Sequence, residues 1–227
     1  MLGVVSLSWV GSSRKRMLDL VLATLGLAVL WPILLIVAAV VKLQDGAAVF
    51  FRQDRVGRGG RLFRIWKFRT MFPGADKRDR GITVAGDSRV TRVGAWLRTY
   101  KVDELPQLFN VLRGEMSLVG PRPEVPRYVD TADPRWRAVL TIRPGTTGLD
   151  SLTYRHEQHV LAASEDPELK YRAVILPEKL ALNLRYARAS SFWLDARVIL
   201  LTVASSICPS CCSPDFVKRS LLGGEAP

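Results

Sequence analysis

Hydrophobic and polar positions divide the chain into one long apolar run and several shorter mixed segments. The apolar run extends from Met17 to Val41 and follows Arg14-Lys15-Arg16. As one helix it would be about 37 Å long at ~1.5 Å per residue, which is enough to cross a bilayer. It is longer than the ~7–15 apolar residues typical of a signal peptide, so a cleaved signal is only a minor alternative.

Pro32 interrupts this run and predicts a kink, because proline removes a backbone hydrogen bond. The arms on either side would be about 22 Å and 15 Å long, each shorter than a ~30 Å hydrocarbon core. Basic residues flank both ends, and basic flanks favour the cytoplasmic side. A bent helix that enters and leaves through the same face satisfies both flanks, whereas a kinked spanning helix fits the hydropathy equally well. Asp19, near the entry, is expected to pair with a neighbouring cation.

The pattern then changes to short aromatic pieces that are typical of β-strands. Val49–Phe51 and Leu62–Trp66 flank Gly57-Arg58-Gly59-Gly60, a strong turn signal, and together they predict a β-hairpin. Seven basic residues and one acidic residue lie from Arg52 to Arg69. They form either a solvated face or a surface for phosphate and lipid headgroups, and the adjoining membrane segment favours the second interpretation.

Apolar residues recur at helical spacing in three later segments. These segments are Arg89–Tyr100, Ser164–Ala187 with a bend near Pro177, and Phe192–Ile207. The last contains Asp195 and Arg197, so we expect it to pack on the domain or to lie at the bilayer surface. Proline and glycine predict rigid turns at Pro121–Pro126 and Arg143–Gly148.

These elements predict a mostly helical α+β fold. We expect a leader at 1–13, a membrane helix at 14–42 kinked at Pro32, a small cytosolic domain at 43–207 and a flexible tail at 208–227. Amphipathic helices at the membrane interface are expected to surround the domain. We find no internal repeat.

The composition of the chain indicates what kind of partner it binds. The chain has 227 residues, a formal net charge of +12, an isoelectric point near 10.2 and a mean hydropathy of +0.11. So large a positive charge predicts a polyanionic partner, such as nucleic acid, anionic lipid or a phosphorylated substrate. The three cysteines, Cys208, Cys211 and Cys212, lie close together, but a zinc site with only two histidines in the chain is not expected. Reduced cysteines, compatible with a cytoplasmic setting, are the favoured interpretation.

Two adjacent acids, Asp103 and Glu104, are unusual in so basic a chain. A carboxylate can attack phosphorus, act as a general base or bind Mg²⁺. Asp103 is a plausible N-cap of the next helix, with Pro106 in its first turn and Gly114 ending it. The helix dipole and the nearby cations Arg98, Lys101 and Arg113 are then expected to lower the carboxylate pKa values.

Arg122 lies between Pro121 and Pro123, and a guanidinium on so stiff a backbone suits bidentate recognition of phosphate. The competing interpretation is purely structural. In that case Asp103 only caps its helix and Glu104 only pairs with Arg98 or Lys101. For an isolated acid pair, that interpretation would be favoured by roughly five to one.

A set of motifs that follow one another along the chain favours the catalytic interpretation of the acid pair over the purely structural one. The motifs are Lys15–Asp19, Val49–Gln53, Lys67–Met71, Asp103–Leu108, Asn110–Pro123 and Arg143–Gly145. With these long and specific motifs, the chain from about Lys15 to about Val203 resembles the bacterial sugar transferase family. Members of this family are monotopic polyprenyl-phosphate phosphoglycosyl transferases.

The resemblance implies a two-step reaction at the cytoplasmic face of the bacterial inner membrane, with a re-entrant rather than a spanning apolar helix. Asp103 would attack the β-phosphate of a UDP-sugar and release UMP. Polyprenyl (undecaprenyl) phosphate would then take the sugar phosphate from the aspartyl intermediate. Mg²⁺ would bridge Asp103 and the diphosphate, and Glu104 would assist through metal or proton handling. Further candidate substrate-binding residues are Lys67, Arg69, Arg98, Arg122, Arg143 and Asp195.

The chain departs from the family pattern in two places. Trp31 precedes Pro32 where a serine is common, which puts the details of the kink in question. Gly148-Leu149-Asp150-Ser151 replaces the usual tryptophan- and glutamine-containing segment, so familiar sugars cannot be assumed. Without extra transmembrane helices, the chain resembles a minimal form of the family.

The resemblance implies an EC 2.7.8-type transferase in surface glycan assembly. Expected partners are the UDP-sugar, polyprenyl phosphate and membrane lipids, but not nucleic acid. The sequence leaves open whether the protein forms a homo-oligomer. The alternative function is a membrane-anchored basic module that binds nucleic acid or anionic lipid without catalysis.

Overall fold

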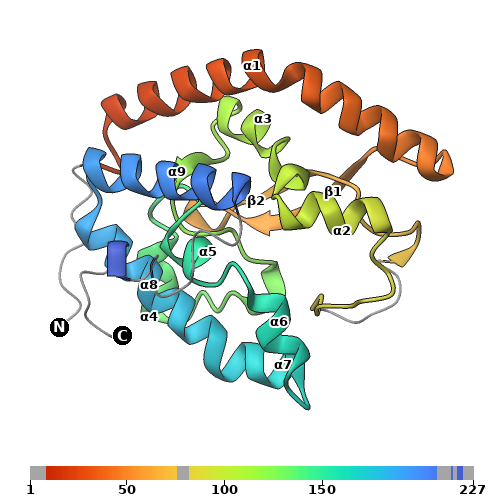
Figure 1. Ribbon diagram of the computed structural model, residues 1–227. Helices are drawn as coiled ribbons and strands as arrows, with labels where there is room; N and C mark the ends of the chain where they lie inside the picture. The colour runs from red at the N-terminus through yellow and green to blue at the C-terminus, as the bar shows by residue number, and fades with distance from the viewer. Residues whose placement is uncertain (1–8, 76–81, 209–215, 217–218, 222–227) are drawn as a thin grey trace.

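The computed structural model describes residues 9–75, 82–208, 216 and 219–221 and shows a mostly helical α+β fold (Figure 1). Two strand pairs lie among the helices. The strands are β1 (Phe50–Val56), β2 (Leu62–Phe68), β3 (Ser117–Val119) and β4 (Gly145–Thr147). The α-helices are α1 (Ser13–Asp45), α2 (Arg92–Thr99), α3 (Gln107–Leu112), α4 (Pro134–Val139), α5 (Leu149–Thr153), α6 (Glu157–Ala162), α7 (Pro167–Lys170), α8 (Leu176–Ala189) and α9 (Phe192–Ile207). This fold class confirms the prediction from the sequence.

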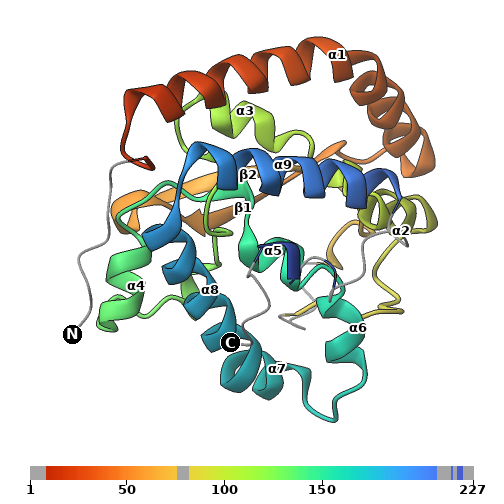
Figure 2. The ribbon, with the colours of Figure 1, turned by 60° about the vertical axis from the view of Figure 1, so that its left-hand side comes forward.

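Helix α1 forms one continuous arch above the rest of the protein (Figures 1 and 2). It begins where the Ser12 side chain accepts a hydrogen bond from the Lys15 backbone, continues through Pro32, and ends at Gly46, whose φ is 71°. It therefore extends beyond the expected 14–42 segment, and its 33 residues span about 50 Å at ~1.5 Å per residue. Within the described ranges, α1 is the helix that is long and apolar enough to cross a membrane.

Both ends of α1 pack on the same underlying domain. Near its start, Ala23 lies in a buried cluster with Val111 of α3. Near its end, Val37 and Val41 lie in a second buried cluster with Phe68 of β2. The outward face of α1 exposes large apolar side chains, which are Met17, Val21, Leu25, Val29, Trp31, Leu35, Ile36, Val40 and Leu43. This exposed apolar surface indicates association with a membrane.

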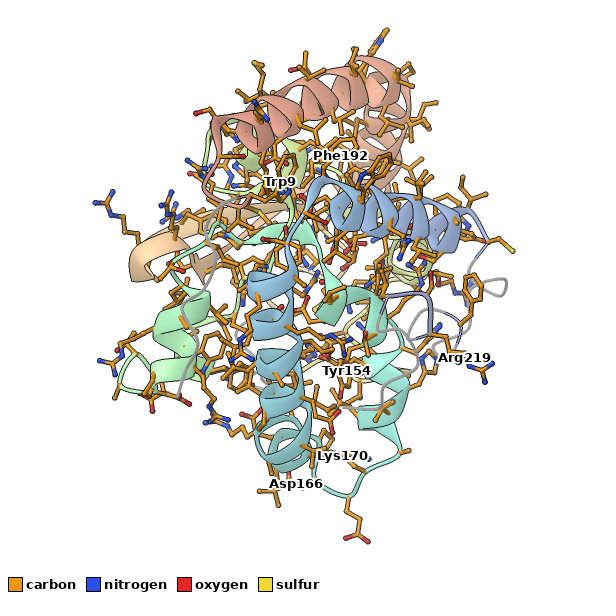
Figure 3. The ribbon with its side chains drawn as sticks, turned by 90° about the vertical axis from the view of Figure 1, so that its left-hand side faces the viewer. Trp9, Tyr154, Asp166, Lys170, Phe192 and Arg219 are labelled. Atoms are coloured by element: carbon orange, nitrogen blue, oxygen red, sulfur yellow. The ribbon has the colours of Figure 1, made fainter. Side chains whose placement is uncertain are left out.

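A buried polar cluster fixes the start of α1 to the C-terminal helices. The Lys15 ammonium donates to Asp195 of α9 at 2.6 Å, and the Trp9 indole N–H and the Tyr186 hydroxyl donate to the same carboxylate at 2.8 Å each. Figure 3 shows Trp9 beside Phe192 at this junction, and their rings meet edge to face at 6.0 Å. Residues 1–8 of the expected leader lie outside the described residues.

The β-hairpin confirms the turn predicted from the glycines. Strands β1 and β2 pair antiparallel from Phe50↔Phe68 to Val56↔Leu62, and Gly59 and Gly60 between them have φ values of 69° and 76°. Asn110 of α3 borders β2, since its amide accepts from the Trp66 backbone at 3.0 Å and donates to the Arg64 carbonyl at 2.8 Å. The hairpin is thereby held directly beside the acid pair that precedes α3.

The helix expected to be broken or bent near Pro177 changes its hydrogen-bonding pattern there, while its backbone stays helical. A π-helical stretch at Tyr171–Ile175 joins α7 to α8, and Pro177 lies at the start of α8. Proline has no N–H, so it cannot complete the regular helical bonding across this junction. Helix α9 begins and ends where the sequence predicted, with Asp195 and Val198 buried and Trp193, Leu200 and Ile207 exposed.

The expectation of reduced cysteines is wrong for Cys208, which is disulfide-bonded. Cys211 and Cys212, like most of the expected flexible tail 208–227, lie outside the described residues. Leu221, which is described, packs against the buried cluster of α8 and α9.

Candidate active site

The acid pair lies in a short 3₁₀ turn, Val102–Glu104, between α2 and α3. Lys101 begins this turn with φ 59° and ψ 20°, the left-handed conformation, and is the one non-glycine residue with positive φ in the described part of the chain. A non-glycine residue in this conformation persists only where the surrounding structure holds it. The position of the two carboxylates is therefore tightly constrained.

The prediction that Asp103 caps α3 is wrong. The helix begins at Gln107, Pro106 occupies the capping position, and no side-chain hydrogen bond caps it. The 3₁₀ turn ends before the helix starts, so Asp103 is too far back along the chain to reach the first helical N–H groups. Gly114, with φ 81°, does follow the end of α3, as expected.

Glu104 is held by two cations that are distant in sequence. Its Oε1 accepts from the Lys67 ammonium at 2.8 Å and from Nη2 of Arg122 at 2.5 Å, and its Oε2 accepts from Nη1 of Arg122 at 3.1 Å. Burial by itself would raise the pKa of Glu104, but Arg122 and Lys67 outweigh burial and hold it well below its usual range. Glu104 is therefore ionised at neutral pH and pairs with neither Arg98 nor Lys101 at close range.

Asp103 is in the opposite situation. It is 6% exposed, and its Oδ1 is buried without a hydrogen-bond partner among the described residues. Burial, followed by the charge of Glu104, raises the pKa of Asp103, although Lys67 opposes this shift. The expected lowering of this pKa is wrong because the loss of water outweighs the nearby cations. A buried carboxylate oxygen without a donor is available to a ligand.

Arg98 reaches the site from α2. Its Nε donates to the Thr70 hydroxyl at 2.8 Å, while its Nη1 is buried without a partner within the described ranges. Burial lowers the pKa of Arg98, and the negative charge of Asp103 opposes this shift. Gly94 lets α2 approach the Thr70 backbone closely, since an added Cβ at this position would lie 2.0 Å from the Thr70 carbonyl oxygen.

Arg122 reaches the site from a loop that two neighbouring backbones clamp. Strand β3, just before the loop, pairs in parallel with β4, and the Gly145 N–H donates to the Pro121 carbonyl at 2.8 Å. Gly145 also has no room for a side chain, since a Cβ would lie 2.1 Å from the Gly120 nitrogen. The predicted Arg-Pro-Gly turn thus serves to position the predicted Pro-Arg-Pro turn.

The structure thus brings together five of the residues selected from the sequence, namely Lys67, Arg98, Asp103, Glu104 and Arg122. Reasoning from the sequence missed Thr70, the partner of Arg98, although it lies in the motif Lys67–Met71. It also missed the left-handed Lys101, for which the sequence carries no signal.

Three other selected residues have different partners. Arg69 binds the Asp45 carboxylate with both Nη atoms, at 2.5 and 2.6 Å, and so attaches the end of α1 to the hairpin. Arg143 donates to the Gly114 carbonyl at 3.1 Å, and Asp195 belongs to the buried cluster at the start of α1. Their expected roles in binding substrate stay predictions.

A buried carboxylate with lysine and arginine near it, below a helix that is long and apolar enough for a membrane, is the arrangement expected of a membrane-associated enzyme that handles phosphate groups. A family model described as "Bacterial sugar transferase" matches residues 10–208. The chain belongs to this family of transferases.

Relatives whose names state an activity agree with this assignment. A UDP-glucose:undecaprenyl-phosphate glucose-1-phosphate transferase of Caulobacter vibrioides is 41% identical over 195 residues, covering 85% of this chain and 69% of the relative. An undecaprenyl-phosphate glucose phosphotransferase of Komagataeibacter xylinus is 39% identical, covering 86% and 36%. A UDP-N-acetylgalactosamine-undecaprenyl-phosphate N-acetylgalactosaminephosphotransferase of Aeromonas hydrophila is 35% identical, covering 83% and 42%. The chain therefore spans less than half the length of the last two.

Proposed function

We propose that this protein transfers a sugar-1-phosphate from a UDP-sugar to polyprenyl (undecaprenyl) phosphate and releases UMP, as an early membrane step of surface glycan assembly. The observation that carries the proposal is the buried, unpaired oxygen of Asp103 within a cluster of cations. The activities that the relatives are named for support the substrate classes.

In the proposed first step, a carboxylate oxygen of Asp103 attacks the β-phosphorus of the UDP-sugar. The bond between this phosphorus and the bridging oxygen breaks, and UMP leaves with the electron pair. In the second step, an oxygen of polyprenyl phosphate attacks the same phosphorus and releases the Asp103 carboxylate. Lys67 and Arg98, whose charges act on Asp103, would stabilise the charge that moves to the phosphate oxygens.

The donor set fits Mg²⁺ in part. Mg²⁺ usually takes one or two carboxylates together with substrate phosphates, and the unpaired Oδ1 of Asp103 provides one such ligand. Both oxygens of Glu104 are already engaged by Lys67 and Arg122. We therefore assign the metal to Asp103, where the ion would neutralise diphosphate charge, and give Glu104 the role of holding the two cations in place. Its low pKa argues against Glu104 as a proton donor.

The packing of α1 supports a re-entrant helix. Both ends of α1 pack on one domain, whereas a spanning helix would place its ends on opposite sides of the bilayer. The site would then lie at the cytoplasmic face, where a soluble UDP-sugar and a lipid phosphate can meet. In this arrangement, a cysteine introduced at Gly11 escapes a membrane-impermeant reagent added from the periplasmic side. Labelling from that side would contradict the re-entrant topology.

The deciding experiment is a screen of UDP-sugars with polyprenyl phosphate and Mg²⁺ in which UMP release is measured. We expect release by the unmodified protein and its loss in Asp103→Asn. Asp54→Asn is a matched control, since Asp54 is an exposed carboxylate that pairs with Arg64 on the hairpin surface, and it should retain release. Without the lipid acceptor, mass spectrometry should find one sugar phosphate added to the peptide that carries Asp103. If Asp103→Asn still releases UMP, Asp103 is not the nucleophile.

A further inference from the structure

Asp150, at the start of α5, is a buried carboxylate that the proposed reaction does not use. It is 1% exposed. Its Oδ1 accepts from the Ser151 backbone N–H at 2.7 Å. Its Oδ2 accepts from the Asn183 amide of α8 and from the Arg122 backbone N–H, at 3.2 Å each. The carboxylate is thus fixed by two neighbours and directed at the loop that carries Arg122.

The bond to Arg122 is special because of the prolines on either side. Neither Pro121 nor Pro123 has a backbone N–H, so the N–H of Arg122 is the one backbone donor in this tripeptide. Asp150 accepts that donor, while the guanidinium of the same residue forms two bonds to Glu104. A continuous set of contacts therefore links Asp150 to the acid pair through Arg122.

Charge complementarity makes this contact stronger than a bond to a neutral acceptor. Burial raises the pKa of Asp150, and the charges of Lys179 of α8 and of Arg122 oppose this shift. Lys179 is itself buried and paired with Glu157. A buried carboxylate is costly unless cations and hydrogen-bond donors compensate it. The fold therefore provides donors from two elements to keep a carboxylate behind the Pro-Arg-Pro loop.

We propose that Asp150 is a positioning residue that acts through Arg122. It fixes the backbone of the loop, so that the guanidinium stays on Glu104 and the cation cluster keeps its shape around Asp103. This inference rests on the proposed function, because the readout is UMP release.

The test is a double-mutant cycle of Asp150→Asn and Arg122→Lys, measured as kcat/KM for UMP release. Asparagine keeps the size of Asp150 but removes its charge, and lysine keeps the charge of Arg122 but cannot form the paired bonds to Glu104. Residues that orient a functional side chain typically contribute ~10–100-fold to activity, so we expect Asp150→Asn to cost about tenfold in the unmodified protein. In the Arg122→Lys background it should cost less than about twofold, since the geometry it maintains is already lost.

Asp19→Asn is the matched control. Asp19 is also buried and also accepts a backbone N–H, that of Leu118, but it does not bind the Arg122 loop. It should lower kcat/KM by the same factor in both backgrounds. If Asp150→Asn behaves in this way too, Asp150 is merely structural and the proposal is wrong.

A second variant covers the case in which Asp150→Asn does not fold. Asn183→Ala removes one donor to Asp150 and leaves its charge, and its loss of kcat/KM should likewise shrink in the Arg122→Lys background. An equal loss in both backgrounds would overturn the proposal. If the unmodified protein releases no UMP from any UDP-sugar, the proposed function itself fails. If it releases UMP but the effects of the Asp150 and Arg122 substitutions simply add, only the role of Asp150 fails.

Discussion

Replacing Asp195 with alanine tests whether this residue holds α1 in place or binds substrate. Its carboxylate is buried and accepts from Lys15, Trp9 and Tyr186. These partners belong to the start of α1, the segment before it and α8. The contacts therefore assign Asp195 to the attachment of α1, whereas the resemblance to the family suggested substrate binding.

The expected loss of stability follows from the ammonium that would be left behind. The side chains of Lys15 and Asp195 are 5% and 2% exposed, and removing one partner of a buried ion pair typically costs ~3–5 kcal/mol. The Asp19 carboxylate remains 3.8 Å from the Lys15 ammonium and compensates part of that charge. We therefore expect about 3 kcal/mol for Asp195→Ala. For a chain of this size, this corresponds to a melting temperature lower by roughly 6–12 °C.

The assay is thermal unfolding in detergent, combined with the KM for the UDP-sugar at a temperature where all variants are folded. The control combines Lys15→Met and Asp195→Leu with Asp19→Asn, which removes the ammonium together with both carboxylates beside it and should lose less stability than Asp195→Ala alone. KM should not change in either variant. A normal melting temperature with a raised KM would refute this reasoning and return Asp195 to the substrate site.

Three further predictions concern the acid pair and its support. Because the charge of Glu104 raises the pKa of Asp103, Glu104→Gln should lower that pKa and move the acidic limb of the UMP-release profile to lower pH; an upward shift would contradict the coupling. Gly94→Ala should destabilise the protein by ~1–3 kcal/mol despite alanine's better helix propensity, because its Cβ would meet the Thr70 backbone; unchanged thermal unfolding would disprove the close packing. Removal of Mg²⁺ by a chelator should abolish UMP release and its return should restore it, whereas full activity without a divalent cation would exclude the metal role of Asp103.

The sequence predicted those parts of the fold whose signals are local. Glycines predicted the hairpin turn, apolar spacing predicted α2 and α9, and Pro177 predicted the interruption of regular helical bonding at the start of α8. The candidate cations near the acids followed from motifs, and the structure confirms the proximity of Lys67, Arg98 and Arg122.

Burial and long-range pairing carry no local signal, so they could not be predicted from the sequence. The sequence predicted that Asp103 caps α3 and has a lowered pKa. In the structure α3 begins only at Gln107, and the burial of Asp103, which raises its pKa, could not be read from its position along the chain. Asp195 and Lys15 are separated by 180 residues, so their pairing depends on how α1 and α9 pack.

The opposite pKa shifts of Asp103 and Glu104 explain how two adjacent acids can take different roles. The cations Lys67 and Arg122 bind Glu104, which stays ionised and holds them in the buried site. Asp103 is influenced by the charge of Lys67 but, among the residues that the structure describes, its Oδ1 accepts no hydrogen bond and is available to an incoming group. If Asp103 were bonded in the same way, its lone pairs would be occupied and it would be a poor nucleophile. The geometry thus separates the carboxylate that organises the cations from the carboxylate that is free to react, and Arg122, fixed from behind by Asp150, maintains that separation.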